Sequence, residues 1–150
     1  MNYFYRFSSA AKVLFIVFSI LLISGEAFSD IGGRTGRTLK SSVNGCGGCH
    51  SSRDASVSVL INGPSSVATG STNTYSVTIN KAGKTGAGVD IAVRKGILGI
   101  ISSTLHLQSS ELTHIDNIAM SGGQVTLQFS YKAPALATTD TIFATGNATN

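Results

Sequence analysis

From residue 57 onwards, apolar side chains recur at every second position, and this alternation constrains the fold more than any other feature. Successive side chains of a β-strand point to opposite faces, so a period of two is typical of half-buried strands. The strands expected on this basis cover residues 57–61, 75–79, 89–93, 105–107, 125–131 and 141–145. No stretch of the mature chain has the 3.6-residue apolar period of an amphipathic helix. The pattern therefore predicts an all-β domain.

Glycine-rich turn signals separate these runs, at positions 83–88, 96, 99 and 121–123. Short strands at such spacing are typical of two antiparallel sheets packed face to face. We therefore expect residues 55–150 to form an immunoglobulin-like antiparallel β-sandwich of six or seven strands. Residues 146–150 read Gly-Asn-Ala-Thr-Asn, which is the composition of a loop. On this reading the sandwich lacks its last strand.

The first 29 residues have the composition of a secretory signal peptide. Arg6 and Lys12 give a positive start, residues 13–24 are an almost unbroken apolar run, and residues 27–29 read Ala-Phe-Ser. Small residues at the first and last of these three positions are what signal peptidase reads. The apolar run is shorter than the ~20 residues that span a bilayer, which favours cleavage over a membrane anchor. We expect an exported chain that begins near Asp30, is periplasmic, extracellular or at the cell surface, and keeps no stable membrane span.

Residues 30–54 have no apolar periodicity, and we call this segment the leader. It contains Cys46-Gly47-Gly48-Cys49-His50, and C-x-x-C-H is the attachment signature of c-type haem. In such a site the sulfurs of Cys46 and Cys49 bond the two haem vinyl groups, and His50 is the proximal iron ligand. The two glycines let the backbone approach the flat macrocycle without a side-chain clash. Covalent haem attachment takes place outside the bacterial cytoplasm, so the signal peptide and the motif agree.

Other roles fit the same residues. In an exported protein Cys46 and Cys49 can form a small disulfide. With His50 they can also supply three zinc ligands, completed by another histidine. A C-G-G-C pair can be a redox-active dithiol, although no βαβ pattern surrounds it here. The motif together with the export signal favours haem, and the disulfide is the main alternative.

The candidates for a sixth iron ligand are His106, His114 and Met120. His106 lies between two leucines of an alternating run and is expected to face solvent. His114 is expected in a turn that can reach the leader, whereas Met120 is expected to pack in the core. We therefore take His114 as the candidate distal ligand, with an open or water-ligated iron as the alternative.

Removing residues 1–29 leaves nine basic and six acidic residues and a formal charge of +3. Four of the basic residues flank the cysteines, and we call them the basic collar: Arg34, Arg37, Lys40 and Arg53. Such a collar can steer an anionic partner or neutralise haem propionates, and a solvated leader is the alternative. No aromatic interleaving, zinc-finger spacing or long basic helix points to nucleic acid. No Ser/His/Asp order or paired carboxylates can be assigned to one face, so no catalytic residues or enzymatic activity are predicted.

Four short stretches carry a resemblance: residues 32–36 (Gly-Gly-Arg-Thr-Gly), 45–51 (Gly-Cys-Gly-Gly-Cys-His-Ser), 112–114 (Leu-Thr-His) and 146–148 (Gly-Asn-Ala). With them the chain resembles the Reeler-like or choice-of-anchor domains of exported bacterial proteins over nearly all of its mature length. The resemblance implies a secreted or surface-displayed domain with a cytochrome-like haem site at its N-terminal edge, and it gives His114 more weight. Such proteins usually continue past the last stretch into a final strand and often an anchoring segment, both missing here.

These observations predict an exported monohaem c-type cytochrome-like protein with covalent haem c. Its expected role is one-electron transfer with a redox partner protein that the sequence does not identify. The alternative belongs to another class of protein. It is a secreted adhesion or binding module without haem, in which Cys46 and Cys49 form a disulfide.

Overall fold

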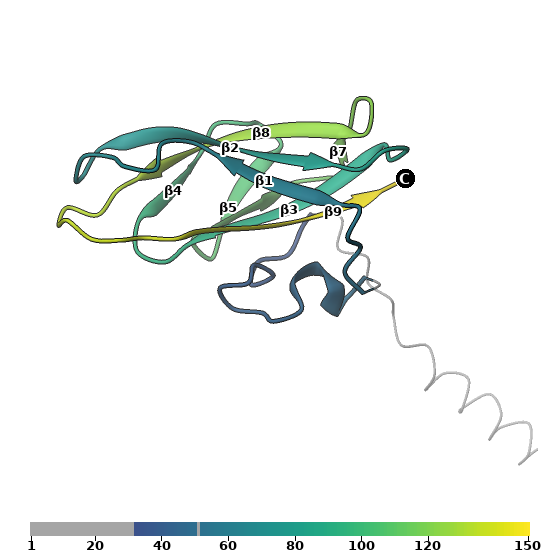
Figure 1. Ribbon diagram of the computed structural model, residues 1–150, viewed down its shortest axis with the longest axis horizontal. Helices are drawn as coiled ribbons and strands as arrows, with labels where there is room; N and C mark the ends of the chain where they lie inside the picture. The colour runs from purple at the N-terminus through teal and green to yellow at the C-terminus, as the bar shows by residue number, and fades with distance from the viewer. Residues whose placement is uncertain (1–31, 51) are drawn as a thin grey trace, which may run out of the picture.

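The structure, a computed structural model, describes residues 32–50 and 52–150, and the signal peptide predicted at residues 1–29 lies outside them. The described chain forms two antiparallel sheets packed face to face (Figure 1). Its regular elements are strands and one short 3-10 turn, η1, at Gly45–Gly48. The predicted all-β sandwich is therefore confirmed. Within the described residues, no helix is long and apolar enough to cross a membrane.

The first sheet has four strands in the spatial order β1-β2-β8-β4. Their bounds are Ser58–Asn62 for β1, Thr72–Asn80 for β2, Gln124–Lys132 for β8 and Ile97–Ile100 for β4. Burial alternates from residue to residue along β2 and β8, as the period of two predicted. These two long strands form the centre of the sheet.

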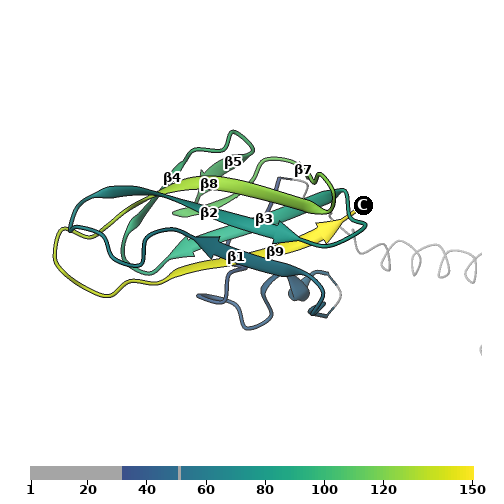
Figure 2. The ribbon, with the colours of Figure 1, turned by 45° about the horizontal axis from the view of Figure 1, so that its top comes forward.

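The second sheet is built around β3, Gly86–Val93. Beside it lie β5 (Leu105–Gln108), β6 (Glu111–His114), β7 (Ile118–Ala119) and β9 (Ile142–Thr149). The order is β5-β6-β3-β7, and β9 pairs with β3 over the full length of both strands. Because β3 bonds β6 and β7 along one edge, β9 occupies its other edge. Figure 2 shows β9 running beside β1 of the first sheet.

The core lies between the two sheets and consists of the inward side chains of both. Its most buried members are at most 3% exposed: Val77, Ile79, Ala87, Val89, Ile91, Leu105, Leu112, Ile118, Leu127 and Phe129. Tyr75 stacks on Phe129 with ring centroids 5.9 Å apart and meets Tyr131 edge-on at 5.7 Å. Burial of these apolar side chains, about 1.5–3 kcal/mol for each large one, is the main stabilising contribution.

The leader lies against the outer face of the second sheet, and Figure 1 shows it as a separate layer below β3 and β9. This third layer explains an unusual property of β3, whose eight residues are all buried. Every second residue of a strand points away from the core, so an eight-residue buried run needs cover on both faces. The sandwich covers one face of β3, and the leader covers the other.

Several expectations about local structure were wrong, and glycine or asparagine was involved in most of them. Gly99 lies inside β4, and Gly86 and Gly88 lie inside β3, although all three were interpreted as turn signals. Residues 146–149, expected to start a loop, continue β9 to Thr149. Gly146 faces the inside of the sandwich there, where a Cβ atom would lie only 2.8 Å from Ile79 Cδ1. Close packing between the sheets therefore favours glycine in this strand.

The number of strands was also underestimated. The described chain has nine strands instead of six or seven, because β4, β6 and β7 were not predicted. His114 was expected in a turn and is the last residue of β6. Met120 packs in the core as expected, and His106 is half-exposed between buried Leu105 and exposed Leu107.

Candidate haem-attachment site

Two acidic side chains of the second sheet hold the leader in place. The Gly36 N–H donates to Glu111 Oε2 (2.5 Å), and the Arg37 N–H donates to Asp90 Oδ2 (2.7 Å). Asp90 is 2% exposed and Glu111 6% exposed, so both acceptor side chains are buried. A buried carboxyl group that lost these donors would be left unsatisfied, at a cost of about 1–3 kcal/mol or more. The carboxyl groups therefore fix the position of the leader on the sheet.

Burial changes the protonation of one member of this pair. It raises the pKa of Asp90 from the usual 3.8 to about 7. Repulsion from the neighbouring Glu111 carboxylate acts in the same direction, whereas the N–H groups of Arg37 and Thr38 stabilise the ionised form and oppose it. Desolvation outweighs the hydrogen bonds, so Asp90 is protonated below about pH 7.

The leader then turns sharply at the cysteine motif. Ser42 Oγ accepts the Gly45 N–H (3.1 Å), and the carbonyl oxygen of Cys46 accepts the N–H groups of Cys49 (3.2 Å) and His50 (3.1 Å). These bonds wind the motif into η1 and the turn that follows it. Gly45 has φ +52°, in the left-handed region that favours glycine. The local geometry therefore keeps both thiols and the imidazole within one short helical turn.

The motif sits against the edge strand β9. The Cys46 thiol donates to Thr145 Oγ1 (3.5 Å), and Thr145 Oγ1 donates to the Arg37 carbonyl oxygen (3.2 Å). Cys46 is half-buried, whereas Cys49 and His50 are exposed. No disulfide joins the two cysteines in this structure. One side of the motif thus rests on β9, and the other side is open to solvent.

Asn147 on β9 contacts His50, and both Asn147 and His114 lie over Gly88 of β3. Asn147 Nδ2 donates to His50 Nε2 (3.3 Å), which therefore presents its lone pair in this direction. Asn147 pairs with Gly88 across the sheet, and a Cβ atom at Gly88 would lie 2.5 Å from Asn147 Oδ1 and 2.8 Å from His114 Cε1. Since Gly88 has no side chain, the space above β3 is left to Asn147 and the His114 ring.

The backbone of Val89 anchors the other edge of the His114 ring. His114 Nδ1 lies 3.1 Å from both the N and the O atom of Val89. If Nδ1 carries the proton and donates to the Val89 oxygen, Nε2 has a free lone pair, as a metal ligand requires. If Nδ1 instead accepts the Val89 N–H, the proton of the neutral ring is on Nε2. His114 was expected to reach the leader, and it does so at Gly33, where a Cβ atom would lie 2.9 Å from Nδ1.

The structure does not assemble the zinc site considered above. Among residues 32–50 and 52–150, no group of three or more His, Cys, Asp or Glu side chains is placed to hold a metal ion. His106 lies on β5 without a described contact to the motif, and Met120 is buried in the core. Of the three candidate distal ligands, His114 is the one beside the leader.

Most of the basic collar is exposed to solvent. Arg34, Lys40 and Arg53 are exposed, and Arg37 is half-buried. The acidic residue at the end of the leader, Asp54, is paired with Lys81 from the β2–β3 turn (Nζ to Oδ2, 2.9 Å). Hydrogen bonds from Ser56, and then the contact with Lys81, hold the pKa of Asp54 well below its usual range. Asp54 therefore remains a carboxylate with its charge directed at Lys81.

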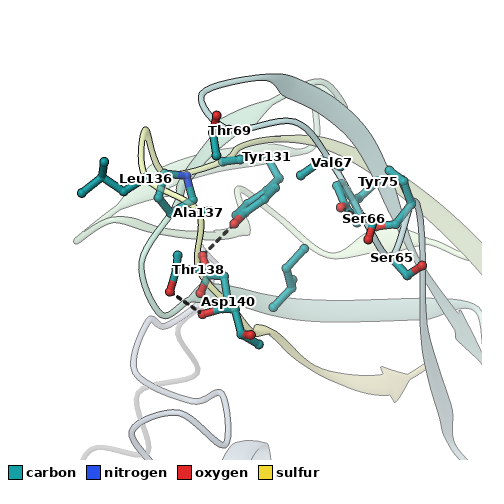
Figure 3. A pocket seen from close by; sticks show the side chains of 15 residues that line it. Ser65, Ser66, Val67, Thr69, Tyr75, Tyr131, Leu136, Ala137, Thr138 and Asp140 are labelled. Atoms are coloured by element: carbon teal, nitrogen blue, oxygen red, sulfur yellow. Dashed lines mark hydrogen bonds between the residues drawn. The ribbon is translucent and has the colours of Figure 1, made fainter.

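A second concave region lies between the β1–β2 and β8–β9 connections and encloses about 470 Å³ (Figure 3). Tyr75 and Tyr131 form its floor, and the Tyr131 hydroxyl donates to Asp140 Oδ2 (2.8 Å). Burial, followed by the contact with Asp140, raises the pKa of Tyr131 to about 12. Sequence reasoning missed this groove because residues of two distant loops form it, and no motif marks them.

Fold and site together define a β-sandwich domain with a docked N-terminal CxxCH leader. One similar solved structure is the reeler domain of human F-spondin. The two chains share 15% sequence identity with a TM-score of 0.41, over 63% of this chain and 76% of that chain. No protein-family model matches the chain, and no curated protein matches it.

Proposed function

We propose that this chain is an exported monohaem c-type protein that transfers single electrons at the periplasm or the cell surface. The observation that carries the proposal is the placement of the CxxCH motif. Its thiols are free, His50 is exposed and contacts Asn147, and Asn147 and His114 both flank Gly88 of β3. Bound haem c supplies reversible one-electron chemistry at its iron.

The residues present fit this group. Cys46 and Cys49 would each add their S–H across one haem vinyl group, so each thioether forms without an oxidant. His50 would hold the iron from one side through Nε2, the atom that here accepts from Asn147. The Val89 carbonyl oxygen can orient His114 through Nδ1, as backbone carbonyls commonly do for metal-binding imidazoles. His114 would be the candidate distal ligand. The basic collar would neutralise haem propionates or meet an anionic partner.

The test is the intact mass and visible spectrum of protein produced in a periplasm that contains the cytochrome c maturation proteins. We expect a mass gain of one haem and a sharp α band on reduction, both abolished by Cys46→Ala with Cys49→Ala. His114→Ala should keep the mass gain and change the Soret band, whereas the matched change His106→Ala should alter neither. A mature protein without haem mass or absorbance contradicts the proposal.

The groove between the β1–β2 and β8–β9 connections supports a second candidate function from a different class. It has ligand-sized volume and lies on loops, where binding residues concentrate. On this reading the chain is a secreted binding or adhesion module, and Cys46 and Cys49 form a disulfide. The same mass measurement separates the two candidates, because a disulfide removes two hydrogens and adds no absorbance in the Soret region.

A further inference from the structure

Asp90 and Glu111 form a buried acidic pair that plays no part in the proposed haem chemistry. They come from neighbouring strands, β3 and β6, and both point away from the core into the space under the leader. Thr113, the partner of Asp90 on β6, and Thr145, its partner on β9, are uncharged. The leader contributes the N–H groups of Gly36 and Arg37, and the Thr38 N–H also favours the ionised form of Asp90.

One oxygen of this pair is unsatisfied as long as Asp90 is ionised. Asp90 Oδ2 accepts the Arg37 N–H, but Asp90 Oδ1 is buried and has no hydrogen-bond partner among the described residues. A proton on Oδ1 turns this oxygen into a donor, and the Glu111 carboxyl group is the neighbouring acceptor. Two carboxyl groups that share one proton avoid both an orphaned oxygen and a second buried negative charge.

We infer that Asp90 and Glu111 are a proton-binding site that controls the docking of the leader: a bound proton favours the docked leader, and its loss favours release. The leader is the cover that keeps water from the pair. When Asp90 loses its proton, the site gains a buried negative charge, which becomes hydrated once the leader lifts away. Docking and protonation therefore favour each other. Haem is not required for this coupling.

The direction of the pH effect follows from the raised pKa of Asp90. The pKa of Asp90 is about 7 with the leader docked, against an ordinary value of 3.8. At pH values between these two pKa values, docking of the leader is therefore accompanied by uptake of a proton. The stabilisation of the docked leader is complete below about pH 3.8 and is lost as the pH rises through about 7. His114, the other titratable residue of β6 near the leader, contacts the Val89 backbone instead of the acidic pair.

The test is amide hydrogen exchange of Gly36 and Arg37, measured on the haem-free protein. Their N–H groups donate to the pair, so their protection reports docking directly. After correction for the intrinsic exchange rate, we expect the protection of these two amides to fall by up to about tenfold per pH unit between pH 5 and 7. Above pH 7 it should level off. Equal protection at pH 5 and pH 8 overturns the inference.

Asp90→Asn keeps an oxygen that can accept the Arg37 N–H, but the asparagine side chain cannot titrate. In this variant the protection of the Gly36 and Arg37 amides should not change with pH. Asp116→Asn is the matched control, because Asp116 is an exposed carboxylate, and it should follow the wild type. A pH-dependent Asp90→Asn variant overturns the inference. The ¹³C carboxyl resonance of wild-type Asp90 gives a check that needs no variant: a midpoint near 7 supports the inference, and one near 3.8 overturns it.

Discussion

Two glycines of the leader have nearly the same left-handed backbone, Gly33 at φ +75° and Gly36 at φ +74°. Their surroundings differ. A Cβ atom at Gly33 would overlap Thr113 Oγ1 and lie 2.8 Å from the His114 carbonyl oxygen, whereas nothing lies within 4 Å at Gly36. Alanine at either position has the conformational cost of about 1–2 kcal/mol that L-residues meet in this region. Only Gly33→Ala adds a collision with the sheet.

We therefore expect Gly33→Ala to loosen the start of the leader more than Gly36→Ala does. The backbone of His114 belongs to β6 and cannot move aside, so the leader must lift away instead. Amide exchange of the leader in the two variants measures the difference, because the conformational cost is common to both. Equal protection in the two variants would show that the leader does not contact β6 as described.

At the scale of single elements, the β5–β6 hairpin contains a local conflict between sequence and backbone. Its two turn residues, Ser109 and Ser110, have φ +49° and φ +64°. A two-residue turn with positive φ at both positions is the type I′ turn, which favours asparagine followed by glycine. Serine is tolerated at these positions at a conformational cost.

Ser110→Gly should stabilise the protein by about 0.5–1 kcal/mol, because relief of the left-handed backbone outweighs the extra entropy that glycine loses on folding. Urea unfolding measures the change. Ser103→Gly is the control, since Ser103 is also an exposed turn residue but is not among those with positive φ. The control should lose stability, and a loss in both variants would argue against the type I′ turn.

The strands with the clearest alternation in the sequence, β2 and β8, have one buried and one exposed face. Alternation in β2 and β8 reflects such an environment, so these strands were found. β6 was missed because Glu111, Leu112 and Thr113 are all buried. Leu112 faces the core, whereas Glu111 and Thr113 face the leader. A charged residue at a buried position breaks the apolar alternation. β9 was cut short because Gly146 and Asn147 have turn propensity, which tertiary packing overrides here.

At the scale of the whole molecule, the sandwich and the leader are separable layers. The apolar core contains no leader residue among those described, so its stabilisation does not depend on the leader. A chain of residues 55–150 should therefore retain a cooperatively unfolding β structure. In that chain the pKa of Asp90 should fall toward its ordinary range, because burial is the largest cause of its shift and the leader covers Asp90.

Circular dichroism with thermal unfolding tests the first expectation, and ¹³C NMR titration of Asp90 tests the second. An unfolded product would show that the leader is part of the folding unit. A pKa that stays near 7 without the leader would assign the shift to Glu111 instead of to burial under the leader.

The candidate site was predicted only in part. Cys46, Cys49 and His50 are recognisable because their chemistry depends on local spacing, which a sequence shows directly. The acidic pair and Asn147 were not predicted, because their role depends on contacts between residues 53 to 97 positions apart. No local pattern encodes which face of a sheet an irregular segment will cover.

The separation between the leader and its docking strand also affects the order of events during folding. Cys46 meets Thr145 across 99 positions, and β9 is the last strand in sequence order. Contacts of such long range form slowly and late. Until β9 joins β3, the leader has no complete surface to occupy, so both thiols stay in an unrestrained segment while the sandwich assembles. We therefore expect the rate at which β9 joins β3 to affect how long Cys46 and Cys49 stay open to reaction.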